Sequence, residues 1–159
     1  MTHNELVKIA KKWLIKARAC VVVLTETQAQ SGEIPDVIGW RGQLSILIEC
    51  KTSVTDFRRD LSKWYRNSGP GIGQHRYFMA PKGVIPQDEV PPGWGLLEVS
   101  GDTVKTTRKV DLLYLDEHVS AAEVPLLVAA LRRTSMRAST ARNHKKKGYS
   151  RSQQRSSSK

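Results

Sequence analysis

Two acidic residues and a lysine stand in a pattern that suits phosphodiester hydrolysis. Asp36 follows a proline, and Glu49-Cys50-Lys51 comes after twelve intervening residues. Carboxylates are natural ligands for hard divalent cations, which bind phosphate oxygens and activate water. A lysine can stabilise negative charge that develops in the transition state. We therefore take Asp36, Glu49 and Lys51 as candidate catalytic residues. The two carboxylates and the Cys50 backbone carbonyl are candidate metal ligands, with Mg²⁺ expected from ligand hardness and Mn²⁺ as its substitute.

Two adjacent strands would bring these residues together. Residues 36–40 predict a short strand, residues 44–51 alternate as a strand does, and Arg41-Gly42 between them predicts a turn. Glu49 and Lys51 are two residues apart, so they share one face of their strand with Leu47. The other face carries Leu44, Ile46, Ile48 and Cys50. Asp36 lies far from the turn, as do Glu49 and Lys51. A hairpin is therefore expected to place both acids and the lysine at one edge of a sheet.

The remaining segments predict an α/β fold in which helices flank a mixed sheet. A first helix and a later one each begin with a capping pattern, Thr2 with Glu5 and Ser53 with Asp56. A last helix begins with Ser120 and Glu123, which have the same spacing. The predicted elements are a helix over 3–17, a buried strand over 18–26, the two strands above, a helix over 54–66, a strand over 75–80, a hairpin over 94–110 and the last helix.

The motif and the order of elements resemble the PD-(D/E)XK nuclease superfamily, and most closely the MmcB-like DNA repair proteins within it. The resemblance covers roughly residues 3–100. It implies a restriction-endonuclease-like core (αβββαβ), metal-dependent DNA cleavage or repair, metal ligation by Asp36 and Glu49, and a charge-stabilising role for Lys51. Its further motifs are Lys51-Thr52-Ser53, Asp56-Phe57-Arg58, Asp60, Trp64, Arg76-Tyr77-Phe78, Ala80-Pro81 and Trp94-Gly95-Leu96-Leu97.

Another acid could complete the metal site. Glu5 is the only acid of the first helix, but its first-turn position favours a capping role. Glu26 and Glu33 are alternatives as ligands or as groups that orient water. Glu33 is preferred because it lies close to Asp36 along the chain.

Basic residues offer contacts for a nucleic-acid backbone. Arg58, Arg59 and Lys63 are expected on the exposed side of the second helix, where they either follow DNA or are simply solvated. Asp56 and Asp60 of the same helix would pair with these bases.

The charge of the chain is concentrated near its C-terminus. The net charge is +11, yet residues 132–159 hold ten Lys and Arg and no acid, so the preceding residues are nearly neutral. We predict a nuclease-like domain over 1–133 and a disordered basic tail over 134–159, in which Lys145, Lys146 and Lys147 bind polyanions through release of counterions.

These features predict a metal-dependent nuclease acting on DNA in repair or in DNA processing. One alternative is a non-catalytic nucleic-acid-binding accessory protein with the same fold, and RNA is a further possible ligand. Cys20 and Cys50 have no metal-ligand spacing and are expected as free buried thiols. We expect a cytoplasmic, DNA-associated protein that makes no membrane contact, since no apolar run is long enough to span a bilayer.

Overall fold

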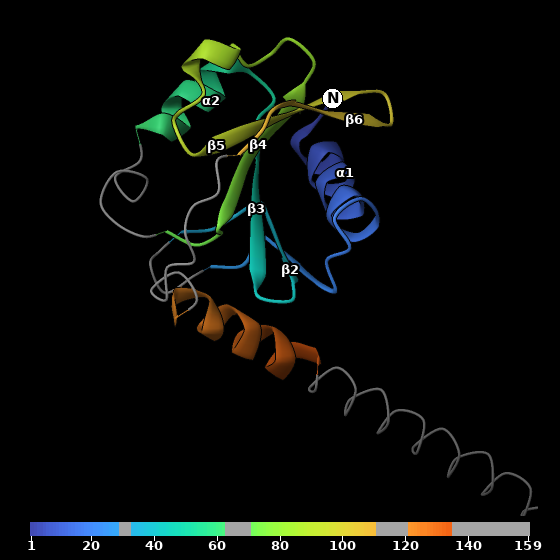
Figure 1. Cartoon of the computed structure of the whole chain (residues 1–159), viewed down its shortest axis with the longest axis vertical. Helices are drawn as coiled ribbons and strands as arrows, with labels where there is room; N and C mark the ends of the chain where they lie inside the picture. The colour runs from blue at the N-terminus through green and yellow to red at the C-terminus, as the bar shows by residue number, and fades with distance from the viewer. Residues whose placement is uncertain (29–32, 63–70, 111–120, 135–159) are drawn as a thin grey trace, which may run out of the picture. The chain divides into compact units, whose positions relative to one another are not determined.

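A mixed sheet of six strands, in the order β1-β2-β3-β4-β5-β6, forms the centre of the fold (Figure 1). The computed structural model describes residues 1–28, 33–62, 71–110 and 121–134. β3 runs parallel to β4 and β4 to β5, and the other neighbours are antiparallel. The elements are α1 (His3–Lys16), β1 (Val22–Thr25), β2 (Val37–Arg41), β3 (Leu44–Cys50), α2 (Val54–Leu61), β4 (His75–Pro81), η2 (Gln87–Glu89), β5 (Trp94–Ser100), β6 (Thr103–Arg108) and a helix over 121–134.

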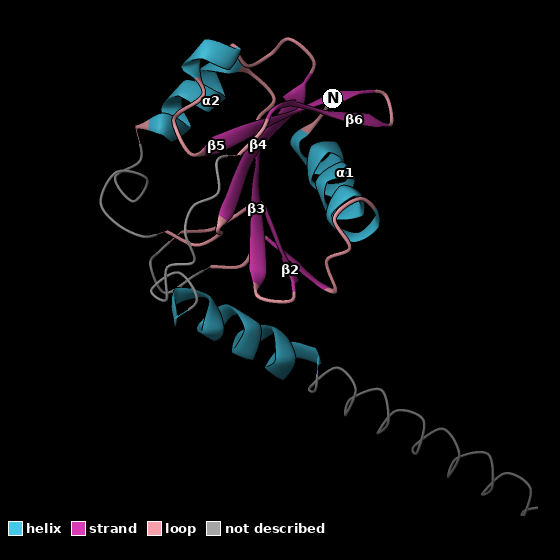
Figure 2. Ribbon diagram, viewed as in Figure 1, coloured by secondary structure: helices cyan, strands magenta, loops and turns pink. Residues whose placement is uncertain are grey.

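Helix α1 covers one face of the sheet (Figure 2). The predicted capping box is present: the Thr2 side chain accepts from the Glu5 amide, and the Glu5 side chain accepts from the Thr2 amide. Leu6, Ala10 and Leu14 follow at helical spacing and are fully buried. They pack in a core cluster with β3 and β4 residues that share one face, among them Ile46, Ile48, Cys50, Tyr77 and Met79. The alternation predicted for residues 44–51 is therefore confirmed.

Helix α2 packs on the opposite face. Ser53 caps it by accepting a hydrogen bond from the Asp56 amide, as predicted. Phe57 lies edge-on to Phe78 of β4 at a centroid distance of 4.9 Å, and Phe78 stacks on Trp94 of β5 at 4.3 Å. The helix ends at Leu61, and the predicted continuation over 63–66 lies outside the described residues.

Strand β1 is shorter and more exposed than the buried strand expected over 18–26. Within the described residues it forms an edge of the sheet and pairs with β2 alone. Val21, just before it, is 84% exposed, and left-handed backbone at Ala19 and Glu26 lies on either side of the strand. The prediction of burial was wrong because an apolar run does not distinguish an edge strand from a central one.

The connections bring the ends of three strands to one edge of the sheet. β2 and β3 form the predicted hairpin, but Arg41 pairs with Leu44, so the turn is Gly42-Gln43 and not Arg41-Gly42. Gly42 has the left-handed conformation (φ +58°) that the turn requires. α2 then carries the chain over to β4, which runs parallel to β3. The start of β2 therefore lies beside the ends of β3 and β4.

The packing of the chain divides it into two units, Met1–Pro125 and Leu126–Lys159. The predicted last helix is present over 121–134. Its expected cap, Ser120, and the predicted tail from residue 135 onward lie outside the described residues.

Candidate active site

The β2–β3 hairpin places Asp36 beside Glu49. Val37 pairs with Ile48, so the preceding residue, Asp36, lies level with Glu49 on the neighbouring strand. The Cys50 amide donates a hydrogen bond of 2.6 Å to Asp36 Oδ2, which ties the carboxylate to the end of β3. The structure therefore brings together the residues that sequence analysis selected.

The negative charge of the Asp36 carboxylate is only partly offset by the neighbouring groups. Its side chain is 17% exposed, and Oδ1 lies 3.4 Å from His3 Nε2. Burial raises its pKa and the nearby Asp60 adds to the effect, although the Cys50 amide, Lys51 and His3 act in the opposite direction. A cation bound to this carboxylate would offset the cost of burying its charge.

Lys51 lies between two buried carboxylates. Its Nζ atom is 3.4 Å from Glu49 Oε2 and 3.3 Å from Asp60 Oδ2. The side chains of all three residues are at most 6% exposed. Removal of one partner from such a buried pair is strongly destabilising, because the other charge stays desolvated. The two ion pairs therefore hold the Lys51 ammonium group next to Glu49.

Asp60 was missed as a member of this site. The sequence pattern favours pairing of Asp60 with the basic residues of its own helix, but the structure buries it against Lys51. The signal was present in the sequence: Asp60 follows Phe57 by three residues and so lies on the same helical stripe, which faces the sheet.

Arg58 and Arg59 of α2 are exposed, as predicted, but Arg58 pairs with an acid outside its own helix. Arg58 makes a two-pronged contact with Glu89, through Nε at 2.8 Å and through Nη2. That contact engages the guanidinium donors that a phosphate would use. Arg59 is exposed. Lys63, Lys145, Lys146 and Lys147 lie outside the described residues.

The structure gives the three additional acids other roles. Glu5 closes the capping box through a 2.7 Å bond from the Thr2 amide, and His3 of the same turn approaches Asp36 instead. Glu26 is exposed, and its amide donates to the Asp36 carbonyl. Glu33 is buried in a separate polar cluster. The carboxylates of Glu5 and Glu33 thus both bind groups of the protein itself.

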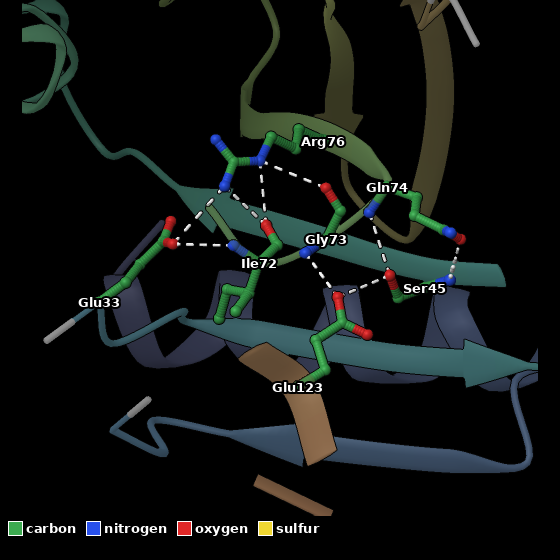
Figure 3. Close-up of polar contacts among 7 residues, drawn as sticks. All are labelled: Glu33, Ser45, Ile72, Gly73, Gln74, Arg76 and Glu123. Carbon is green, nitrogen blue, oxygen red and sulfur yellow. Dashed lines mark hydrogen bonds and ion pairs between the residues drawn. The ribbon is translucent and has the colours of Figure 1, made fainter. Parts of the chain in front are cut away.

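Glu33 binds the chain that leads into β4 (Figure 3). Its Oε2 accepts a hydrogen bond from the Ile72 amide at 3.2 Å and lies 3.5 Å from Arg76 Nη2. The Arg76 guanidinium also donates to the Ile72 and Gly73 carbonyls. These bonds fix the segment just before β4, which explains the burial of both charged groups.

Glu123 fixes the same segment from another direction (Figure 3). Its Oε1 accepts from Ser45 Oγ and from the Gly73 amide, each at 2.7 Å. Its Oε2 accepts from Trp40 Nε1, also at 2.7 Å. The spacing of Ser120 and Glu123 predicts a helix cap, whereas Glu123 is buried and its carboxylate accepts from three donors in the sheet and in the segment before β4.

The donor set at the β2–β3 edge fits an ion that needs few protein ligands. Among the described residues, no three His, Cys, Asp or Glu side chains are grouped so that they could hold a metal ion. Mg²⁺ keeps several waters and is usually bound by one or two carboxylates together with substrate phosphates. Asp36 and Glu49 supply two carboxylates of the kind that such an ion uses.

The comparisons with known proteins bear on the fold alone. No family model matches the chain, and no curated protein matches it. A solved structure, the SPO1766 protein of unknown function from Silicibacter pomeroyi, is similar with a TM-score of 0.64 and 21% identity. The match covers 84% of this chain and 90% of that one. Within the part of the chain that the structure describes, no helix is long and apolar enough to cross a membrane.

Proposed function

We propose that this chain is a metal-dependent nuclease that hydrolyses DNA phosphodiester bonds, built on a restriction-endonuclease-like core. One observation carries the proposal: Asp36, Glu49 and Lys51 meet at one edge of a mixed sheet, with Lys51 held 3.4 Å from Glu49. The order of helix, three strands, helix and strand is compatible with that core. The basic C-terminal region adds the charge that a polyanionic substrate requires.

Each residue of the site has a distinct role in this proposal. Asp36 and Glu49 would hold Mg²⁺ or Mn²⁺, together with the Cys50 carbonyl. Such an ion polarises a phosphate oxygen and lowers the pKa of a bound water. Lys51 stabilises negative charge on the phosphate, and its contacts with Glu49 and Asp60 keep its ammonium group in place.

The decisive experiment is a cleavage assay on labelled DNA. Duplex, single-stranded, flap and junction substrates are incubated with the full chain and Mg²⁺ or Mn²⁺, and the parent is compared with Asp36→Asn. We expect cleavage that requires the metal and is lost in the variant, while DNA binding is retained. Cleavage by Asp36→Asn at the parent rate would show that the site is assigned wrongly.

Asp60 is expected to act as a positioning residue for Lys51. Asp60→Asn keeps the shape of the side chain but removes one of the two charges that hold the ammonium group. We expect kcat to fall by about tenfold or more, in line with the loss of an outer-shell partner, with little change in KM. Steady-state kinetics separate the two parameters. Asp56→Asn, in the first turn of the same helix, is the control and should leave kcat unchanged.

A second function has its own supporting observation. Lys51 is compensated by two buried carboxylates, an arrangement that also suits a purely structural ion pair in a non-catalytic nucleic-acid-binding protein. In that case the DNA panel would show binding without cleavage under either metal. Competition between matched DNA and RNA in the same assay would identify the preferred nucleic acid.

A further inference from the structure

Helix α1 presents a row of lysines to solvent. Leu6, Ala10 and Leu14 are buried against the sheet, which fixes the orientation of the helix. The opposite side carries four lysines, all exposed, and with Ile15 they line an open hollow of about 250 Å³. The four are Lys8, Lys11, Lys12 and Lys16.

These lysines lack acidic partners among the described residues. None of the ion pairs within residues 1–28, 33–62, 71–110 and 121–134 includes them. Glu5 lies one turn before Lys8 and interacts with it electrostatically, but its carboxylate is engaged in the capping box. Like charges four residues apart destabilise a helix, so the side chains of Lys8, Lys12 and Lys16 repel one another. An external polyanion would relieve that repulsion.

The geometry of the row favours a regularly charged polymer. Lys8, Lys12 and Lys16 recur every four residues, so their Cα atoms advance by about 6 Å each along a rigid helix and span about 12 Å. Duplex DNA carries about one charge per 1.7 Å of its axis. A membrane surface is a poorer partner, because the apolar face of α1 is already buried in the core.

The helix also links this row to the candidate active site. His3, in the first turn of α1, lies 3.4 Å from Asp36, and the lysines follow along the same helix. We propose that Lys8, Lys11, Lys12 and Lys16 form a surface that binds the phosphate backbone of duplex DNA, independently of base sequence. The proposal takes DNA as partner from the proposed function, but it concerns binding and does not require cleavage.

The test measures the salt dependence of DNA binding by the full chain. Anisotropy of a labelled duplex is followed in EDTA, so that no metal-dependent cleavage occurs. Lys8, Lys12 and Lys16 are replaced together by Gln, which has a similar helix propensity. Each lost phosphate contact should reduce the slope of log Kobs against log [salt] by about 0.9, or about 2.7 for three. Affinity at about 0.1 M salt should fall by about tenfold or more.

A second triple variant controls for net charge. Lys82, Lys105 and Lys109 are exposed, and their replacement by Gln removes the same charge from other elements. This variant should keep the parent slope. Equal losses in both triple variants, or no loss in the α1 variant, would overturn the proposal. So would an α1 variant that loses binding to anionic vesicles while DNA binding is unchanged.

The outcomes also separate this surface from the nuclease proposal. A reduced slope in the α1 variant without any cleavage by the parent would support the surface and reject the nuclease. Metal-dependent cleavage with an unchanged slope would support the nuclease and reject the surface. Circular dichroism and thermal unfolding confirm that each variant is folded.

Discussion

Glu49→Gln is expected to lose metal-dependent DNA cleavage by at least about a hundredfold, while DNA affinity stays within about twofold. A direct metal ligand should matter no less than the outer-shell partners, whose loss costs about 10–100-fold. Gln keeps the size of the side chain and one oxygen that can accept a hydrogen bond from Lys51. The Lys51 ammonium group, which lies 3.4 Å from Glu49 Oε2 in the parent, therefore keeps an acceptor. Single-turnover cleavage measures the chemical step.

Metal affinity gives this variant a readout that does not depend on cleavage. Calorimetric titration with Mn²⁺ should show weaker binding to Glu49→Gln than to the parent. Glu26→Gln is the matched control, because Glu26 is an exposed acid whose backbone amide donates a hydrogen bond to the Asp36 carbonyl. If Glu26→Gln lost metal binding while Glu49→Gln retained it, the metal ligands would have to be reassigned.

Glu123→Ala is expected to lower the free energy of unfolding by about 3 kcal/mol or more. The substitution leaves three donors without their acceptor: the Trp40 indole, the Ser45 hydroxyl and the Gly73 amide. A buried polar group left unsatisfied costs about 1–3 kcal/mol, and these groups lie in a buried region of the sheet. Urea denaturation followed by circular dichroism measures the loss.

Glu123→Gln is the control for this prediction. Its amide oxygen can still accept from Ser45 and Gly73, so only the bond from the Trp40 indole is lost. We expect a destabilisation of about 1–2 kcal/mol, well below that of the alanine variant. If the free energy of unfolding of Glu123→Ala lay within about 0.5 kcal/mol of that of the parent, the buried network would not be stabilising the segment before β4.

Local patterns in the sequence predicted most of the framework. The capping box of Thr2 and Glu5, the turn at Gly42 and the alternation along β3 are each determined by residues close in the chain. They also placed Asp36 at the same end of the hairpin as Glu49 and Lys51, whereas the pairing of Asp36 with Glu49 depends on the exact position of the turn, which is Gly42-Gln43 and not Arg41-Gly42. This part of the candidate site followed from the β2–β3 segment alone.

The burial of each strand could not be predicted from local patterns. The apolar run Val21–Leu24 predicted a buried strand, but β1 lies at the edge of the sheet. Which strand is central depends on the number of neighbours it acquires, and those neighbours come from distant parts of the chain.

The partners of the buried charges depended on the tertiary structure for the same reason. Asp60 pairs with Lys51, and Glu123 binds Trp40 across 83 positions of sequence. Near the start of a helix the sequence favours a capping role for an acid, because a cap requires only neighbouring residues. A carboxylate is buried only when distant donors repay its desolvation. The sequence by itself therefore predicted most of the described elements and the shared end of the hairpin for Asp36 and Glu49, because these depend on residues close in the chain, whereas the folded chain determined which other charged groups surround them.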